Sequence, residues 1–189
     1  MISASAFILI GGKSDRFGSQ KWQSIIAGKS VFDHIWDACS GFENRFVIGK
    51  KKPHKLVKPF IFDELEIQAP INGLYTALKH SKTDWILLLS CDLPLIDADV
   101  FQTLWDTRTK EADAVIPVAY DRNQGTSALY HKRILPQLES TFQYADHSLY
   151  SLTEKLNSIK VEFEDDKRFW NMNTKKDFVE ISNFIANKV

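Results

Sequence analysis

The sequence predicts an α/β protein with a three-layer α/β/α fold, built around a mostly parallel β-sheet with an antiparallel edge. Short apolar runs alternate with helical segments through the first part of the chain, which is typical of a parallel sheet covered by helices on both faces. The run Trp85–Leu89 is continuously apolar, as expected for a strand buried on both sides. After Tyr120 the alternation changes, so we expect the antiparallel edge in the later half.

The expected strands are short apolar segments that end at glycine, aspartate or a polar turn. Trp85–Leu89 is the most apolar of them, and we place it at the centre of the sheet. In chain order the expected strands are Ala6–Ile10, Arg45–Ile48, Phe60–Phe62, Trp85–Leu89, Ala114–Val118, Thr126–Tyr130 and Ile159–Phe163.

The expected helices are marked mainly by residues that begin helices. Ser30 and Asp97 are favourable N-cap residues, and Thr174 with Asp177 three positions later forms a capping-box pattern. In chain order the helices are expected from Ser30 to before Gly41, Leu74 to about His80 after a Pro70–Gly73 start, Asp97 to about Lys110, Lys132 to about Phe142, Leu149–Leu156, and from Thr174 onwards.

Length and composition narrow the class of protein. The 189 residues suffice for one domain, expected to span residues 1–189. Lys+Arg and Asp+Glu both number 24, and this balance argues against a nucleic-acid-binding protein. We expect a cytoplasmic protein without membrane contact, because no apolar leader and no apolar run of about 20 residues is present. Cys39 and Cys91 lack metal-type spacing and fit a reduced, intracellular protein.

The loop after the first expected strand is the most informative stretch of the chain. The strand ends at Gly11-Gly12, where the backbone can approach a ligand closely. Backbone N–H groups and cationic side chains in such a loop suit a polyphosphate. The loop has neither the Walker spacing nor G-x-G-x-x-G, and an ordinary glycine-rich turn is the alternative. The remaining loop residues of interest are Lys13, Arg16, Gly18 and Lys21.

Polar residues follow three of the expected strands: Gly11-Gly12, Asp63 and Asp92. Ligands of open α/β sheets bind beyond the carboxyl ends of the strands, so we expect these residues to line one crevice. Asp92, which precedes Leu93-Pro94, is placed to hold Mg²⁺ on the phosphates of a nucleotide, because Mg²⁺ takes one or two carboxylates plus phosphate oxygens. A role in capping the turn is the alternative.

Further charged residues have weaker assignments. Asp63 could accept the two N–H groups on the edge of guanine, or it could be a turn carboxylate. Lys21 could neutralise the α-phosphate or the leaving pyrophosphate, or it could be a surface lysine. The run Lys50-Lys51-Lys52 could meet phosphate, although so short a run favours a solvated turn. The histidines show no ligand-pair spacing, and we expect them at the surface or on helices.

Several motifs together carry a resemblance to a known family. They are L-I-G-G-K-S-D-R-F-G-S-Q-K, then A-P-I-N-G-L-Y-T-A-L after Asp63, L-L-L-S-C-D-L-P-L-I and N-M-N-T-K-K-D-F. With these motifs the chain resembles the MobA-like nucleotidyltransferases, and among them the molybdenum cofactor guanylyltransferases. The resemblance covers nearly the whole chain, and it implies a Rossmann-like sheet of the nucleotide-diphospho-sugar transferase type.

The resemblance also implies an activity and a set of site residues. The activity is transfer of GMP from GTP to the terminal phosphate of molybdopterin or molybdenum cofactor, with release of pyrophosphate. Asp92 would bind Mg²⁺, Asp63 would contact guanine, and Asn171 and Asn173 would lie near the acceptor. The residues implied in nucleotide binding are Leu9, Ile10, Gly11, Gly12, Lys21, Asp63 and Asp92. Those assigned to catalysis are Lys21, Asp92 and Arg16.

Two alternatives stay open. The chemistry could use CTP, or another nucleotide with a sugar- or alcohol-phosphate acceptor. The protein could also be a non-catalytic nucleotide-binding homologue, because Gln20 stands where the family usually has an acidic residue, and His147 stands where it has arginine. Besides GTP and molybdopterin, proteins of the cofactor pathway are possible partners.

Overall fold

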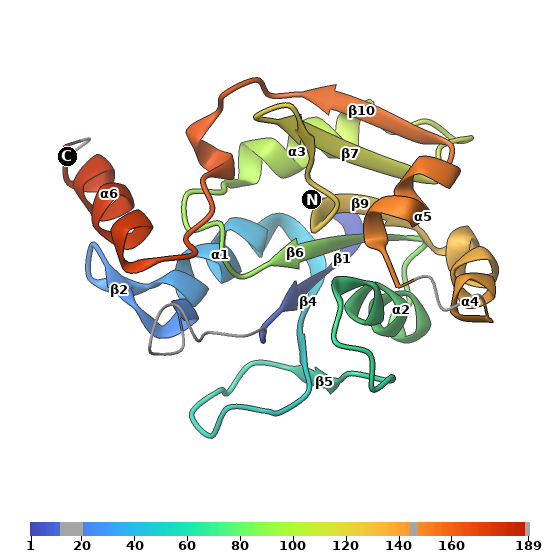
Figure 1. The fold of residues 1–189 in the computed structure, drawn as a ribbon, viewed down its shortest axis with the longest axis horizontal. Coiled ribbons are helices and arrows are strands. Elements are labelled where there is room, and N and C mark those ends of the chain that lie inside the picture. Colours follow the sequence, from blue (N-terminus) through green and yellow to red (C-terminus); the bar gives the residue numbers. More distant parts are fainter. Residues whose placement is uncertain (12–20, 144–146, 188–189) are drawn as a thin grey trace.

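The computed structural model describes residues 1–11, 21–143 and 147–187 (Figure 1). Its main sheet has the strand order β10-β7-β9-β6-β1-β4-β5, with β8 paired to β7. The strands are β1 (Ile2–Leu9), β4 (Phe42–Gly49), β5 (Phe60–Phe62), β6 (Trp85–Ser90), β7 (Ala114–Ala119), β8 (Arg122–Asn123), β9 (Ser127–His131) and β10 (Ser158–Glu162), while β2 (Ile25–Ile26) and β3 (Lys29–Ser30) form a small separate ribbon.

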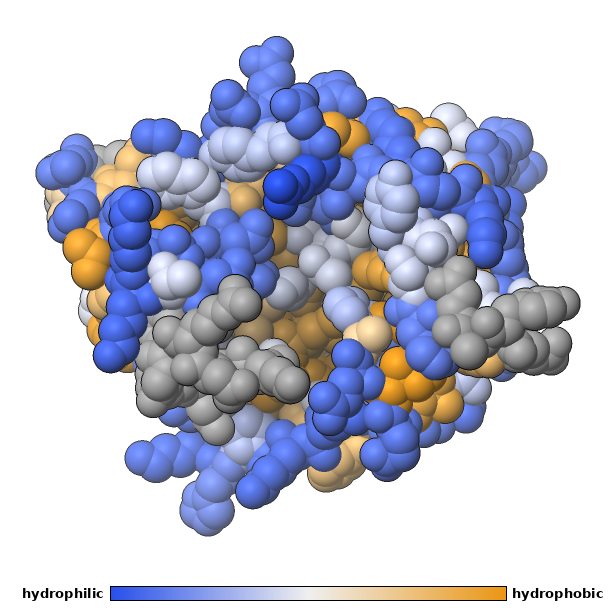
Figure 2. Space-filling view, in the orientation of Figure 1, coloured by the Kyte–Doolittle hydropathy of each residue, from blue (hydrophilic) through white to orange (hydrophobic). Residues whose placement is uncertain are grey.

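The part of the sheet that positions the site is parallel. β1 pairs in parallel with β4 on one side and with β6 on the other, and β4 pairs in parallel with β5. The carboxyl ends of these four strands therefore lie along the same edge of the sheet. A cleft opens there, and Figure 2 shows a hollow on this face with hydrophobic residues inside and hydrophilic residues around it.

One antiparallel strand, β9, lies inside the sheet, whereas the sequence led us to expect antiparallel pairing at an edge. β9 pairs antiparallel with β6, where Trp85 faces His131, and antiparallel with β7, where Ala114 faces Tyr130. The chain leaves β7 through a tight turn at Tyr120 and Asp121, which have φ values of 53° and 55°. This reversal returns the chain into the space between β7 and β6, where both edges of β9 are paired.

Helices cover both faces of the sheet, and this arrangement confirms the predicted three-layer α/β/α fold. Buried side chains of α1, α3 and α6 belong to the core on one face, and those of α2, α4 and α5 to the core on the other. The helices are α1 (Val31–Ala38), α2 (Pro70–His80), α3 (Ala98–Thr107), α4 (Leu135–Gln143), α5 (Leu149–Lys155) and α6 (Lys175–Ala186).

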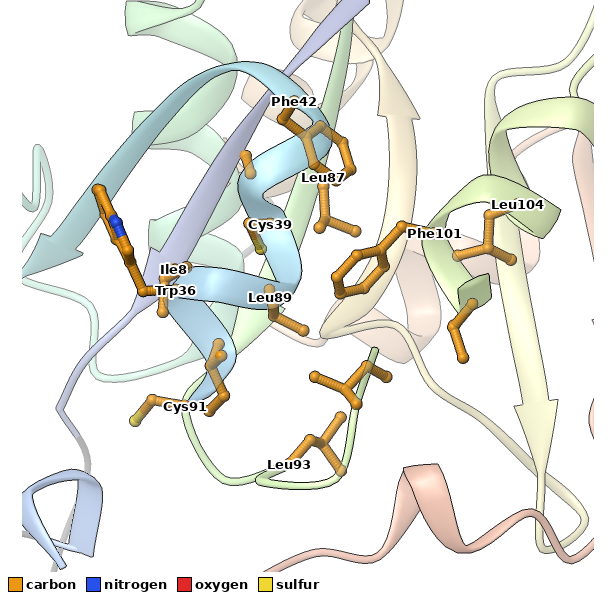
Figure 3. Close-up of a cluster of buried hydrophobic side chains, with 14 of the residues drawn as sticks. Ile8, Trp36, Cys39, Phe42, Leu87, Leu89, Cys91, Leu93, Phe101 and Leu104 are labelled. Carbon is orange, nitrogen blue, oxygen red and sulfur yellow. The ribbon is translucent and has the colours of Figure 1, made fainter. Parts of the chain in front are cut away.

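The side chains of β6 alternate between these two cores. Leu87 and Leu89 join the core beneath α1 and α3, and Ile86 and Leu88 join the core beneath α2. Figure 3 shows the first core, in which Phe101 of α3 lies near the two strand leucines. Because the period of a strand is two, only a strand covered on both faces can be apolar at every position.

The helix starts follow the capping chemistry expected from the sequence. The Ser30 hydroxyl accepts a hydrogen bond from the Asp33 amide at 3.0 Å, and Thr174 forms a complete capping box with Asp177. One start differs, because α2 begins at Pro70 rather than at Leu74. Proline suits the first turn of a helix, where its missing N–H would have no intrahelical partner.

Candidate nucleotide-binding site

The carboxyl ends of the parallel strands and the loops after them enclose a cleft of about 740 Å³. Leu9, Ile10 and Gly11 line it from the end of β1, Asp63 from the end of β5, and Asp92 from the end of β6. These residues are far apart in the sequence, and the parallel pairing of the strands brings them to one side of the sheet.

The end of β1 is held in place by its neighbour. The Ile10 amide donates a hydrogen bond to the Ile48 carbonyl oxygen at 2.9 Å, which continues the β1–β4 ladder past the strand. Gly11 then has a φ of 138°, a conformation that residues with a Cβ rarely adopt. Gly12 and Arg16 lie outside the described residues. Lys21 begins a short 3₁₀ helix (Lys21–Gln23), and its side chain lies outside the described part of the chain.

Asp92 is half-buried at the carboxyl end of β6 and lines the cleft. Among the described residues its carboxylate has no hydrogen-bond or ion-pair partner. A carboxylate with its oxygens uncommitted beside a cleft fits Mg²⁺, which needs few protein oxygens when phosphates and waters complete its coordination. The described part of the chain holds no cluster of three or more His, Cys, Asp or Glu residues, so its residues do not build a closed all-protein metal cage.

Asp63 lies across the cleft at the end of β5. Its backbone amide donates to the Gly49 carbonyl oxygen at 3.2 Å, which fixes the residue beside the end of β4. Burial of the carboxyl group raises its pKa above the ordinary value, and the nearby ammonium group of Lys50 opposes this rise. Asp63 is thus a partly desolvated carboxylate, and N–H donors from a ligand would stabilise its ionised form.

Lys50 and Lys51 line the same cleft, although their sequence context favoured an ordinary solvated turn. Both lysines are exposed, as expected for a solvated turn. The Lys50 ammonium group also donates to the Glu66 carbonyl oxygen at 2.9 Å, which links the end of β4 to the segment after Asp63. The sequence did contain a sign that Lys50 and Lys51 line the cleft, because they follow the carboxyl end of β4. The same criterion selected Asp63 at the end of β5.

Asn171 and Asn173 do not line the cleft and are exposed. The residue between them, Met172, is fully buried, and its amide donates to the Asp92 carbonyl oxygen at 2.8 Å. The structure therefore places the two asparagines beside the end of β6, next to the cleft rather than in its wall.

Sequence reasoning missed other residues of the cleft wall. Trp22 lines it from the 3₁₀ helix, and Thr126 lines it just before β9. The Ser90 amide donates to the Thr126 carbonyl oxygen at 2.7 Å, so Thr126 reaches the site only because β9 lies beside β6. No residue pattern signals this neighbour relation.

Nothing among the described helices has the length and apolar character needed to cross a membrane.

The chain matches the MobA-like NTP transferase domain family over residues 6–159. A protein of Aquifex aeolicus named "Probable molybdenum cofactor guanylyltransferase" is 33% identical over 94% of this chain and 89% of its own length. The "Molybdenum cofactor guanylyltransferase" of Vibrio parahaemolyticus is 27% identical over 92% of each chain. The crystal structure of molybdopterin-guanine dinucleotide biosynthesis protein A from Archaeoglobus fulgidus shares the fold, with a TM-score of 0.81 and 22% identity over 98% of this chain and 100% of that one.

The family match includes the glycine loop, Asp63 and Asp92, which is the part of the chain that builds most of the cleft. The resemblance inferred from the motifs is thereby confirmed, as is the prediction that the protein is a nucleotidyltransferase. Fold, cleft and sequence match agree that this chain belongs to the MobA-like NTP transferase family.

Proposed function

We propose that the protein transfers GMP from GTP to the terminal phosphate of molybdopterin or molybdenum cofactor, with release of pyrophosphate. One observation carries the proposal: Gly11, Asp63 and Asp92, from three different strand ends, line a single cleft. The names of the relatives, molybdenum cofactor guanylyltransferases, support the choice of substrates.

The triphosphate of GTP would lie at the end of β1. Gly11 has a positive φ and no Cβ, so the backbone there can approach the phosphates closely. We assign the following residues, Gly12, Arg16 and Lys21, to the phosphates as well, on the basis of the loop pattern in the sequence. Lysine and arginine would neutralise charge that moves onto the leaving pyrophosphate.

Asp92, beyond the end of the neighbouring strand β6, would hold Mg²⁺. The ion supplies Lewis-acid polarisation of the phosphate oxygens when it is bound. The part of this chain is to present at a fixed place one carboxylate that no other described residue engages, and the end of the buried strand β6 does so. The Met172 hydrogen bond to the Asp92 carbonyl oxygen holds the backbone at that place.

Asp63 would select the base. An ionised carboxylate accepts the two N–H groups that guanine presents on one edge, whereas cytosine presents a single amino donor beside acceptors. Asn171 and Asn173 would contact the acceptor from the C-terminal segment. The phosphate of the acceptor is ionised at neutral pH, so positioning and charge neutralisation suffice without a general base.

A nucleotide panel tests the choice of base. In thermal shift measurements with Mg²⁺ and equal concentrations of GTP, CTP and ATP, we expect GTP to give the largest increase in Tm. A ligand present at 100 times its Kd stabilises the folded state by about 2.7 kcal/mol, so the differences are measurable. A larger shift with CTP would contradict the guanine assignment and leave the nucleotidyltransferase class intact.

A further inference from the structure

A buried asparagine on α2 fastens the segment that follows Asp63. Asn72 is 1% exposed, and its side-chain amide forms hydrogen bonds with Leu65, Ile67 and Thr76. Its Oδ1 accepts from the Leu65 amide at 3.1 Å, and its Nδ2 donates to the carbonyl oxygens of Leu65 and Ile67, the latter at 3.1 Å. Both donors and the acceptor of the amide are thus used on backbone groups of the 65–67 segment.

Thr76, one turn further along α2, extends this attachment. Its hydroxyl is fully buried, accepts from the Glu64 amide at 3.0 Å and donates to Asn72 Oδ1 at 3.5 Å. The backbone from Glu64 to Ile67 is therefore bound to the inner face of α2 at four groups. On the far side, Lys50 Nζ donates to the Glu66 carbonyl oxygen at 2.9 Å.

The fastened segment lies between parts of the cleft wall. Asp63 precedes it directly, and Ile67, Gln68 and Ala69 line the cleft at its end. The packing of α2 against the sheet is provided by other residues, because Ile71, Leu74, Ala77 and Leu78 are all fully buried in the core. The hydrogen bonds of Asn72 therefore fix the wall of the cleft, and they are not needed to pack α2 against the sheet.

We propose that Asn72 is a positioning residue for base selection: by fixing the 64–67 backbone it holds Asp63 and the adjoining cleft wall in the geometry that discriminates between nucleotides. The inference rests on the proposed function in so far as Asp63 is the residue that reads the base. It assigns the discrimination to a residue that does not itself contact the nucleotide. Thr76 contributes through the Glu64 amide, with a smaller share because it fixes one backbone group.

The test compares Asn72→Ala and Thr76→Val with Leu78→Ala. Leu78→Ala is the control because Leu78 is fully buried in the core on the same helix, and its apolar side chain forms no hydrogen bond with the 64–67 backbone. The Kd values of GTP, ATP and CTP with Mg²⁺ are measured by titration calorimetry for the wild type and each variant, together with Tm. The quantity of interest is the ratio between the Kd of the second-best and of the best nucleotide.

We expect Asn72→Ala to lower this ratio by about tenfold, because displacements below 1 Å in a recognition geometry have effects of this size. Thr76→Val should lower it less, and Leu78→Ala should lower Tm while leaving the ratio unchanged. An unchanged ratio in folded Asn72→Ala would overturn the inference, and so would an equal loss in Leu78→Ala, since the ratio would then follow stability alone.

The outcomes also separate this inference from the proposed function. A wild-type preference for a nucleotide other than GTP would contradict the guanine assignment, while the change of the ratio in Asn72→Ala would still decide the role of Asn72. A wild-type protein that binds no nucleotide would overturn both.

Discussion

The backbone amide of Met172 donates a hydrogen bond to the carbonyl oxygen of Asp92, with 2.8 Å between nitrogen and oxygen. This bond joins the segment before α6 to the end of β6, although the two residues are far apart in the sequence. Met172 is fully buried, so water does not compete for the bond. The segment with Asn171 and Asn173 is thereby fixed next to the carboxylate that we assign to Mg²⁺, and acceptor and metal would meet at one end of the cleft.

The assignment of Asp92 makes a direct prediction for Asp92→Asn. The variant keeps the shape of the side chain and loses the charge, so we expect metal-dependent turnover to fall by at least about 100-fold while Tm changes little. Asp106→Asn is the control, because Asp106 is exposed on α3 and does not line the cleft. Steady-state pyrophosphate release measures both. Full activity in Asp92→Asn would contradict the metal assignment.

The close approach of two backbones predicts an effect of Gly49→Ala. A Cβ at Gly49 would lie 2.6 Å from the Ile10 carbonyl oxygen, so β4 or the end of β1 must shift. We expect a loss of about 1–3 kcal/mol in the free energy of unfolding, as for other overpacked sites, together with weaker nucleotide binding. Gly41→Ala is the matched control, since a Cβ there meets no atom within 4 Å. Urea denaturation checks the difference, and equal stability of the two variants would contradict it.

The raised pKa of Asp63 predicts opposite effects of Asp63→Asn on stability and on binding. Burial raises the pKa of Asp63 in the folded protein above 3.8. At pH values between 3.8 and this raised pKa, the folded protein holds a proton that the unfolded chain has released. The ionised carboxylate therefore destabilises the fold above its folded pKa. We expect Asp63→Asn to be modestly more stable than the wild type at pH 7, with the difference shrinking as the pH falls and vanishing below 3.8.

GTP binding should depend on pH in the opposite direction to the stability of the fold. GTP affinity of the wild type should fall as the pH drops through the raised pKa of Asp63, because the protonated carboxyl group cannot accept two N–H groups. Urea denaturation and calorimetric titration across the pH range measure the two effects. A less stable Asp63→Asn at pH 7, or GTP binding that does not change on acidification, would contradict this account of Asp63.

The ammonium group of Lys50 opposes the rise in the pKa of Asp63, which predicts an effect of Lys50→Ala. Without this charge the pKa of Asp63 should rise further, and the pH at which GTP affinity declines should move upwards. We also expect an affinity loss of about two- to fivefold at neutral pH, typical of an exposed charge and reduced by added salt. Lys52→Ala is the control, because Lys52 is exposed and lies outside the cleft wall. Equal pH profiles of the two variants would contradict the coupling.

The elements of the fold were largely predictable because each is signalled locally. Ser30, Asp97 and Thr174 mark helix starts through their own side chains, and each cap is present in the structure. The continuous apolar run of β6 required a strand covered on both faces. The place of β9 was not predictable, because its neighbours depend on how the chain returns from β7, and periodicity carries no information about that choice.

In the candidate site, too, residues with a local sequence signal were predictable, and residues that depend on the neighbours of a strand were not. Asp63 and Asp92 could be selected because each lies within two residues of the end of a strand, and parallel strands bring their ends together. Thr126 could not be selected, since it reaches the cleft through the position of β9. Asn72 could not be selected either, because an asparagine near a helix start reads as an ordinary polar residue until its backbone partners are known.

The central claim is that the cleft transfers a nucleotidyl group to a phosphate acceptor. It is tested most directly by pyrophosphate release from GTP and Mg²⁺ by the purified protein, with and without molybdopterin. We predict release with the acceptor and none without it. Bound GTP without release in the presence of molybdopterin would contradict the claim, and it would point to a different acceptor or to a protein that binds the nucleotide without turnover.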